Sequence, residues 1–179
     1  AEAAARVDVP RRPSAKRCNV NATVNSQVLA AELRLLNKVC PTKPAIAILS
    51  HALLRADGDA LHLYATDLEV ALSASCPAQV DAPGAVALPV AKLLQLVEQF
   101  PDADVVIGMA KKHVAVTCGA FRSKLQAMPT ADFPQAPDVD GPSFAVDAAD
   151  LSRLIQRTRY AINASSSKYI MQGALLTVA

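Results

Sequence analysis

The chain has 179 residues, a formal net charge of +2, 52% hydrophobic residues and 4% aromatic residues. This length and apolar content provide for one hydrophobic core and part of a second, built from Ala, Val, Leu and Ile. No apolar run approaches the ~20 residues that cross a bilayer. The near-neutral charge leaves nucleic-acid binding open, because a DNA-binding surface needs its basic residues on one face rather than in overall excess.

The cysteines predict neither a metal site nor a disulfide framework. None of them forms a C-x-x-C pair or a Cys/His cluster with metal-ligand spacing. They are Cys18, Cys40, Cys76 and Cys118. Such cysteines are typical of small buried hydrophobes in a reducing cytosol, so we predict a cytoplasmic protein without a metal or other cofactor.

Residues 1–19 are rich in Ala and then in Arg, Pro and Lys, without hydrophobic periodicity. They predict a disordered leader, which is either a solvated tail or a basic arm that touches DNA. The chain begins at Ala1 rather than at a methionine, and it ends at Ala179 within an apolar run. Both ends therefore look cut.

The first predicted elements are a strand, a capped helix and another strand. The strand covers residues 22–24, and Asn25 or Ser26 caps the helix. Glu32 interrupts the apolar stripe of this helix, which is otherwise Val28, Leu29, Leu33, Leu36 and Val39. Prolines in the next loop end the helix, and a strand follows near residues 52–55.

Alternating residues then predict antiparallel strands. Residues 56–59 form a hairpin turn. The two strands that follow this turn are predicted to be half-buried. The inward-facing residues are expected to be Leu61, Leu63, Ala65, Val70, Leu72, Ala74 and Cys76. Residues 81–84 read as a turn and residues 86–88 as a short strand.

Pro89 opens a second helix at a favoured first-turn position. Its buried stripe comprises Val90, Leu93, Leu94 and Val97. Three further strands are predicted at residues 105–108, 114–118 and 121–128, which completes a first domain at residues 20–128. Residues 129–142 contain four prolines and are predicted to be a linker.

After the linker, the same kinds of element begin again. A strand is predicted at residues 144–146, followed by a helix that Asp147 caps, with Asp150 three residues further on. The apolar stripe of this helix comprises Leu151, Leu154, Ile155 and Thr158. A strand region is predicted from Ile170 to Val178.

These two series of elements form an internal repeat. A shift of 122 residues places Val24 on Val146 and the cap Asn25 on the cap Asp147. Apolar positions coincide at the same shift: Leu29 with Leu151, Leu33 with Ile155, Ile48 with Ile170, and Leu49 with Met171. Self-similarity over so long a period indicates repeated structural units. We therefore predict an α+β fold of tandem domains, in which the second, at 143–179, is present only at its start.

Several stretches resemble, in order, the signatures of a known family. They are PTKPAIAILS at residues 41–50, TDLE at 66–69, the region 119–134 and KYIMQG at 168–173. Together they resemble the bacterial sliding clamp, the beta subunit of DNA polymerase III, over roughly residues 20–179. The resemblance implies a DNA-clamp fold with antiparallel sheets and two helices per domain. It also implies a three-domain protomer that dimerises into a ring around duplex DNA.

The implied function is that of a non-enzymatic processivity factor. Such a ring tethers the replicative polymerase by topology, binds duplex DNA without sequence specificity, and has DNA polymerase III subunits and a clamp loader as partners. This chain would be an incomplete N-terminal fragment of it. The alternative is a truncated paralogue or interaction module that cannot form a ring.

An enzyme of another class is disfavoured, because the sequence has no Gly-rich phosphate loop, catalytic triad or metal-ligand spacing. Asp67 and Glu69 could suggest a catalytic carboxylate pair. Neither has a companion nucleophile or histidine, so we assign them to a turn and a strand.

The resemblance assigns DNA contacts to two kinds of position. Lys43 matches a basic position that touches DNA. Four cations with i,i+4 spacing lie on helices that would face the hole: Arg34 and Lys38 on the first, Arg153 and Arg157 on the second. Simple solvated helix faces are the alternative.

Other family positions fall in the second segment and on one strand. Ser165, Lys168 and Tyr169 lie in a loop used near DNA, although a serine replaces the usual acidic residue. Met171 lies at the rim of the family's pocket for partner peptides. The strand with Arg122 and Leu125 is implied to pair with the other protomer, and a plain edge strand is the alternative.

Overall fold

The computed structural model describes residues 20–42, 44–110, 113–135, 144–163 and 165–177. The predicted leader at 1–19 and the second half of the predicted linker, 136–142, lie outside these residues. The chain divides into two compact units, the first ending after residue 135 and the second beginning before residue 144 among the described residues.

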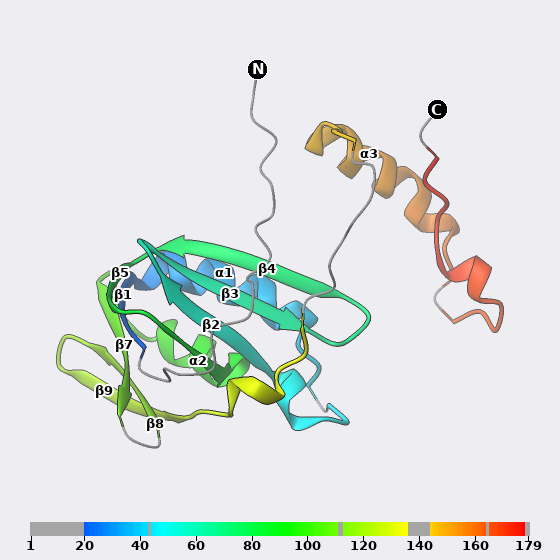
Figure 1. The fold of residues 1–179 in the computed structure, drawn as a ribbon. Helices are drawn as coiled ribbons and strands as arrows, with labels where there is room; N and C mark the ends of the chain where they lie inside the picture. The colour runs from blue at the N-terminus through cyan, green and yellow to red at the C-terminus, as the bar shows by residue number, and fades with distance from the viewer. Residues whose placement is uncertain (1–19, 43, 111–112, 136–143, 164, 178–179) are drawn as a thin grey trace. The chain divides into compact units, whose positions relative to one another are not determined.

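The first unit is built on two antiparallel sheets (Figure 1). The five-stranded sheet has the order β5-β1-β7-β8-β9, and the four-stranded sheet has the order β4-β3-β2-β6. The strands of the five-stranded sheet are β1 (Asn21–Asn25), β5 (Gln79–Ala82), β7 (Asp104–Ala110), β8 (His113–Cys118) and β9 (Phe121–Gln126). Those of the four-stranded sheet are β2 (His51–Asp57), β3 (Ala60–Thr66), β4 (Ala71–Pro77) and β6 (Gly84–Pro89).

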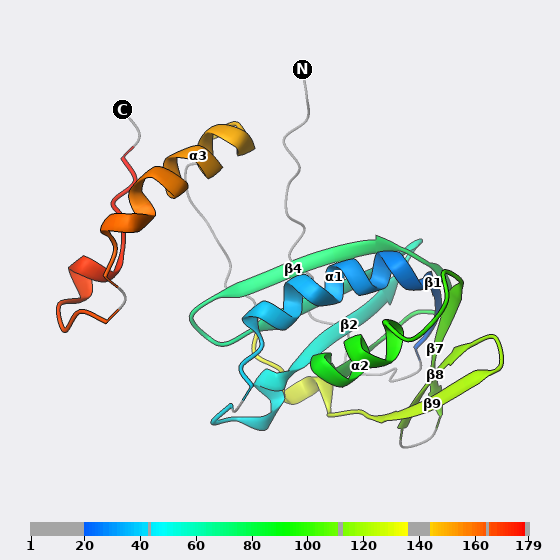
Figure 2. The same cartoon turned by 180° about the vertical axis from the view of Figure 1, so that it is seen from behind.

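Two α-helices pack side by side over the sheets (Figure 2). Helix α1 (Ser26–Val39) begins after Asn25, whose side-chain oxygen accepts hydrogen bonds from the backbone N–H groups of Gln27 and Val28. Helix α2 (Val90–Val97) follows Pro89, whose fixed φ suits a helix start. The number of helices in this unit and the Asn25 cap agree with the sequence predictions. No described helix combines the length and hydropathy needed to span a bilayer.

The main core lies between the two helices and the inner faces of both sheets. Its largest fully buried side chains come from α1, α2, five strands and the residue before β1: Leu29, Leu33, Leu36, Leu54, Leu61, Leu63, Leu88, Leu93, Ile107, Val20, Val24 and Val86. The β2–β3 hairpin turns at Gly58, which has φ of 58° and confirms the predicted turn. A glycine suits this position because other L-residues avoid positive φ.

A second apolar cluster covers the outer face of the four-stranded sheet. Tyr64 is 3% exposed and meets Phe133 edge-on, with 5.8 Å between the ring centroids. Ile48 and Ala87 complete the buried part of this cluster. Tyr64 points to this outer face, as its alternation with Leu63 and Ala65 predicts, but Phe133 covers it and it is buried. Packing of the first unit therefore continues beyond Met128 into the segment predicted as linker.

Three other local predictions for this unit are corrected. Residues 81–84 were expected to be a turn, but strand β5 runs to Ala82 because it pairs with β1. Val28 is exposed, and Ser26 and Ala30 take buried positions on α1 instead. Val70 is 55% exposed because it precedes β4 rather than lying in it.

The second unit repeats the start of the first. Helix α3 (Ala148–Thr158) and a 3₁₀ turn, Arg159–Ala161, together match the span of α1 at a shift of 122 residues. The Asp147 side chain accepts hydrogen bonds from the N–H groups of Ala149 and Asp150, at the positions matching the Asn25 cap. A 3₁₀ turn at Tyr169–Gln172 likewise matches Ala47–Ser50 of the first unit.

The two strands predicted for this unit do not form in its described residues. Residues 144–146 are irregular, and the predicted strand region from Ile170 begins with a 3₁₀ turn and continues without regular structure to residue 177. A strand is stabilised by hydrogen bonds to neighbouring strands. In the first unit β1 lies between β5 and β7, and β2 between β3 and β6, but the described second unit supplies no such neighbours.

Candidate nucleic-acid interface

The exposed sides of α1 and α2 form one helical face of the first unit (Figure 2). Arg34 and Lys38, one turn apart on α1, are both exposed on it. The guanidinium Nε of Arg34 donates to Oε1 of Glu98, the residue directly after α2, across 2.8 Å. No described residue forms an ion pair with Lys38. The two predicted cations of α1 thus lie on one surface, where Arg34 is paired with a carboxylate and Lys38 is not paired with any described residue.

Hydrogen bonds fix the start of α1 to the loop that follows α2. The buried hydroxyl of Ser26 donates to the carbonyl of Pro101 across 2.7 Å and accepts from the N–H of Ala103. The amide of Asn25 donates to the carboxylate of Asp102 across 2.8 Å. These contacts set the relative position of the two helices, and therefore of the charges that they carry.

Lys92 on α2 is a further exposed cation on this face that sequence reasoning missed. Burial lowers the pKa of His51, the Ala47 carbonyl opposes this through a hydrogen bond, and the charge of Lys92 lowers the pKa further. His51 is thus neutral at pH 7, and lysine and arginine carry the positive charge here. Lys43, predicted to touch DNA, lies outside the described residues.

In the second unit, α3 carries the two remaining predicted helix cations. Arg153 and Arg157 are both exposed, and Arg153 pairs with Asp150 one turn earlier. Arg157 lies in the last turn, where a cation interacts favourably with the helix dipole. This helix presents its cations to solvent, as α1 does.

Hydrogen bonds within the loop after α3 give it a defined shape. The N–H of Asn163 donates to the carbonyl of Met171, and the N–H of Met171 donates to the carbonyl of Lys168, both across 2.9 Å. Ser165 and Tyr169 are exposed, and Tyr169 is 87% exposed. The loop thus presents a hydroxyl, a phenol and the exposed ammonium of Lys168 to solvent.

The remaining predicted site residues have different surroundings. Met171 is 50% exposed. Strand β9 is an edge of the five-stranded sheet, with Arg122 exposed and paired in register with Thr117 of β8. Leu125 is 8% exposed and belongs to the core, so its side chain is not available to a partner.

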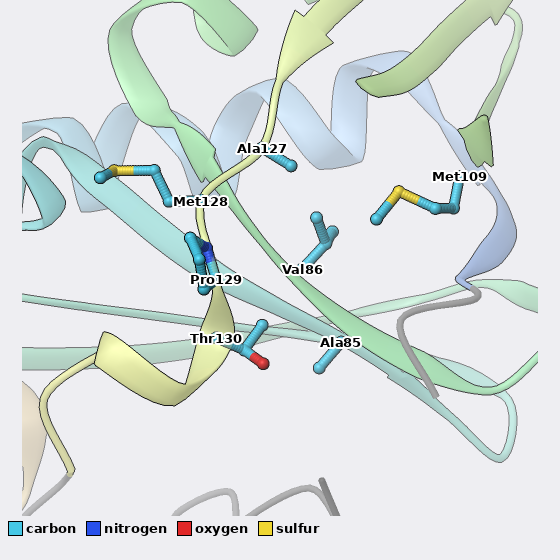
Figure 3. Close-up of a pocket in the computed structure, with 7 residues that line it drawn as sticks. All are labelled: Ala85, Val86, Met109, Ala127, Met128, Pro129 and Thr130. Atoms are coloured by element: carbon cyan, nitrogen blue, oxygen red, sulfur yellow. The ribbon is translucent and has the colours of Figure 1, made fainter. Parts of the chain in front are cut away.

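An apolar pocket opens between β6, β7 and the segment after β9, and none of its lining residues titrates (Figure 3). They are Ala85, Val86, Met109, Ala127, Met128, Pro129 and Thr130. Burial raises the pKa of Cys40 to about 11 and that of Cys76 to about 12, so both are thiols at neutral pH. No metal-binding cluster of His, Cys, Asp or Glu occurs among the described residues.

Comparison with known proteins agrees with this fold. The family described as "DNA polymerase III beta subunit, N-terminal domain" matches residues 20–137. The beta sliding clamp of Chlamydia pneumoniae is 30% identical over 87% of this chain, and that of Caulobacter vibrioides is 34% identical over 84%. The chain spans only 43% and 42% of the length of these curated relatives.

Solved structures of sliding clamps match this chain over a similar share of its length. The DNA polymerase III subunit beta of Pseudomonas aeruginosa has a TM-score of 0.81 and 29% identity, covering 86% of this chain and 42% of that one. The DNA polymerase sliding clamp of Caulobacter crescentus has a TM-score of 0.80 and 34% identity, with the same two coverages.

Proposed function

The chain belongs to the DNA polymerase III beta subunit family, and from this membership we propose that it is the N-terminal part of a sliding clamp. In this proposal it contributes one complete domain, and the start of a second, to a ring that encircles duplex DNA. The ring holds the replicative polymerase on its template and acts in the cytoplasm without breaking or forming bonds. DNA polymerase III subunits, a clamp loader and a second protomer are its proposed partners.

The 122-residue repeat is the observation that carries the proposal. A helix with the same cap, the same length including its 3₁₀ end, and the same following 3₁₀ turn begins each unit. A ring around a cylinder is built economically from similar domains placed in succession, each offering the same helix to the centre. A capped, cation-bearing helix at the start of each unit supports this arrangement.

The cations on these helices suit a sliding contact. Arg34, Lys38, Arg153 and Arg157 sit on exposed helix faces, where they attract phosphates without reaching base edges. Contacts of this kind carry no sequence information, and salt weakens them. They keep DNA near the ring centre, while topology rather than affinity prevents dissociation.

Retention on circular DNA tests the proposal. Residues 20–179 would replace the aligned part of the Caulobacter vibrioides clamp, and the chimera would be loaded on a nicked plasmid by that relative's clamp loader. We expect the chimera to remain on circular DNA through gel filtration at high salt. We expect it to be lost once the plasmid is cut, because a ring slides off a free end.

The unmodified relative serves as the positive control, and the size of the free chimera confirms that it dimerises. A dimeric chimera that dissociates equally from circular and linear DNA would contradict the proposal. That result would favour the alternative of an interaction module that cannot encircle DNA.

A further inference from the structure

One carboxylate lies among the cations of the helical face. The Glu98 Oε1 atom accepts from Nε of Arg34 at 2.8 Å, and the two side chains are 36% and 53% exposed. The two residues are 64 positions apart in the chain, so the pair depends on the packing of α1 against α2. Both partners remain accessible to solvent and therefore to a passing phosphate.

The one acidic residue of α1, Glu32, cannot substitute for Glu98. Glu32 is half-buried, and its charge helps to raise the pKa of Cys76, which lies on β4. It therefore sits on the β4 side of α1, whereas Arg34 points to α2. Lys38 lies one turn beyond Arg34, and Lys92 is exposed near the start of α2. Glu98 is thus the carboxylate that forms an ion pair with a cation of this face, Arg34.

We propose that Glu98 limits DNA binding by occupying Arg34, so that α1 offers one free cation instead of two to the phosphate backbone. This inference rests on the proposed function and concerns how strongly that surface binds. A phosphate that approaches Arg34 meets the negative charge of the Glu98 carboxylate, which already accepts from Nε of the guanidinium. The pair thereby weakens nonspecific attachment, which favours a protein that has to move along DNA.

The energetics of the pair allow a phosphate to compete with Glu98 for Arg34. An ion pair between exposed side chains contributes about 0–1 kcal/mol to folding, because water screens it and ordering two long side chains has an entropic cost. Removing Glu98 should therefore leave the fold intact. Each additional cation that contacts a phosphate steepens the salt dependence of binding by about one unit on a log–log scale.

The test measures binding of the 179-residue chain to a fluorescent 20-base-pair duplex by anisotropy, between about 50 and 200 mM salt. Glu98→Gln should tighten binding about threefold to fivefold at the lowest salt and steepen the salt slope by about one. Glu69→Gln is the matched control, because it makes the same charge change in the exposed loop after β3. It should alter affinity by less than about twofold.

The double variant Arg34→Gln/Glu98→Gln decides whether Glu98 acts through Arg34. Its affinity should equal that of Arg34→Gln alone, because there is then no arginine to release. Circular dichroism confirms that each variant is folded.

The inference is overturned if Glu98→Gln binds no more tightly than Glu69→Gln, or if its gain persists when Arg34 is absent. It is also overturned if neither the parent chain nor Glu98→Gln binds the duplex. The proposed function is judged separately, since retention of the chimera on circular DNA requires ring closure and not the affinity of one helix.

Discussion

The turn between β3 and β4 shows how single residues here serve structure rather than catalysis. The carboxylate of Asp67 accepts hydrogen bonds from the N–H groups of Glu69 and Val70. The hydroxyl of Thr66 donates to the carbonyl of Val70 and accepts from the N–H of Leu68. Leu68 has φ of 80°, which L-residues rarely adopt, and these bonds hold it there. The assignment of Asp67 to a turn is thereby confirmed.

Asp67 should make stability depend on acid. The N–H groups of Val70 and Glu69 lower the pKa of Asp67 below its ordinary value. Its ionised form therefore stabilises the fold at pH values above the unfolded pKa, and this contribution is lost as pH falls through the folded pKa. Asp67→Asn keeps the acceptor oxygen but removes the charge.

The difference in melting temperature between parent and Asp67→Asn should be largest near pH 7 and should shrink as the pH falls through the lowered pKa of Asp67. Thermal unfolding followed by circular dichroism at several pH values checks this. A difference that stays constant from neutral to acid pH would assign the effect of the substitution to geometry instead of charge.

At the scale of elements, the two capped helices place equivalent residues in different environments. Leu33 of α1 is fully buried, whereas the equivalent Ile155 of α3 is 55% exposed. Leu33→Ala should lower the free energy of unfolding by about 3 kcal/mol, because it leaves a cavity in the core. Ile155→Ala should change it by less than about 0.5 kcal/mol.

Urea denaturation of both variants, followed by far-ultraviolet circular dichroism, measures the two effects. The pair is matched, since both substitutions shorten an aliphatic side chain at the same position of a similar helix. Equal losses of stability would mean that Ile155 is packed as tightly as Leu33.

Elements that local sequence specifies were predictable, and those that depend on distant partners were not. The caps Asn25 and Asp147 act on N–H groups two and three residues away, so the sequence alone identifies them. Strand β5 was missed because turn-forming residues overlap its end, and pairing with β1 decides its conformation. The burial of Tyr64 was missed because its cover, Phe133, comes from a remote segment.

The same distinction applies to the candidate site. Helical spacing places Arg34 and Lys38 on one exposed face, which a sequence pattern can predict. The ion pair of Arg34 with Glu98 depends on two helices meeting, so no local pattern contains it. The strands expected at 144–146 and from Ile170 have suitable residues but no neighbouring strand among the described residues.

At the scale of the whole molecule, the two units should differ in the free energy of local unfolding. The first unit has an extensive buried core, whereas α3 contains no buried residue. An isolated helix of this length is marginal in water, because most helix stability in proteins comes from packing. Stability is accordingly expected to be concentrated in the first unit.

Amide hydrogen exchange followed by mass spectrometry tests this expectation. Peptides from α1, β2, β3 and β7 should be protected for hours, and peptides from α3 should exchange within seconds to minutes. Comparable protection in α3 would show that it is packed against a partner in solution.

The equal spacing of the two capped helices also bears on the origin of the chain. A cap, a helix, its 3₁₀ end and a later 3₁₀ turn recur without a single insertion or deletion between them. Tandem duplication of an ancestral gene segment leaves this kind of record. Side chains at equivalent positions have since diverged, as Ser26 and Ala148 illustrate, while the lengths that set the path of the backbone have been inherited intact.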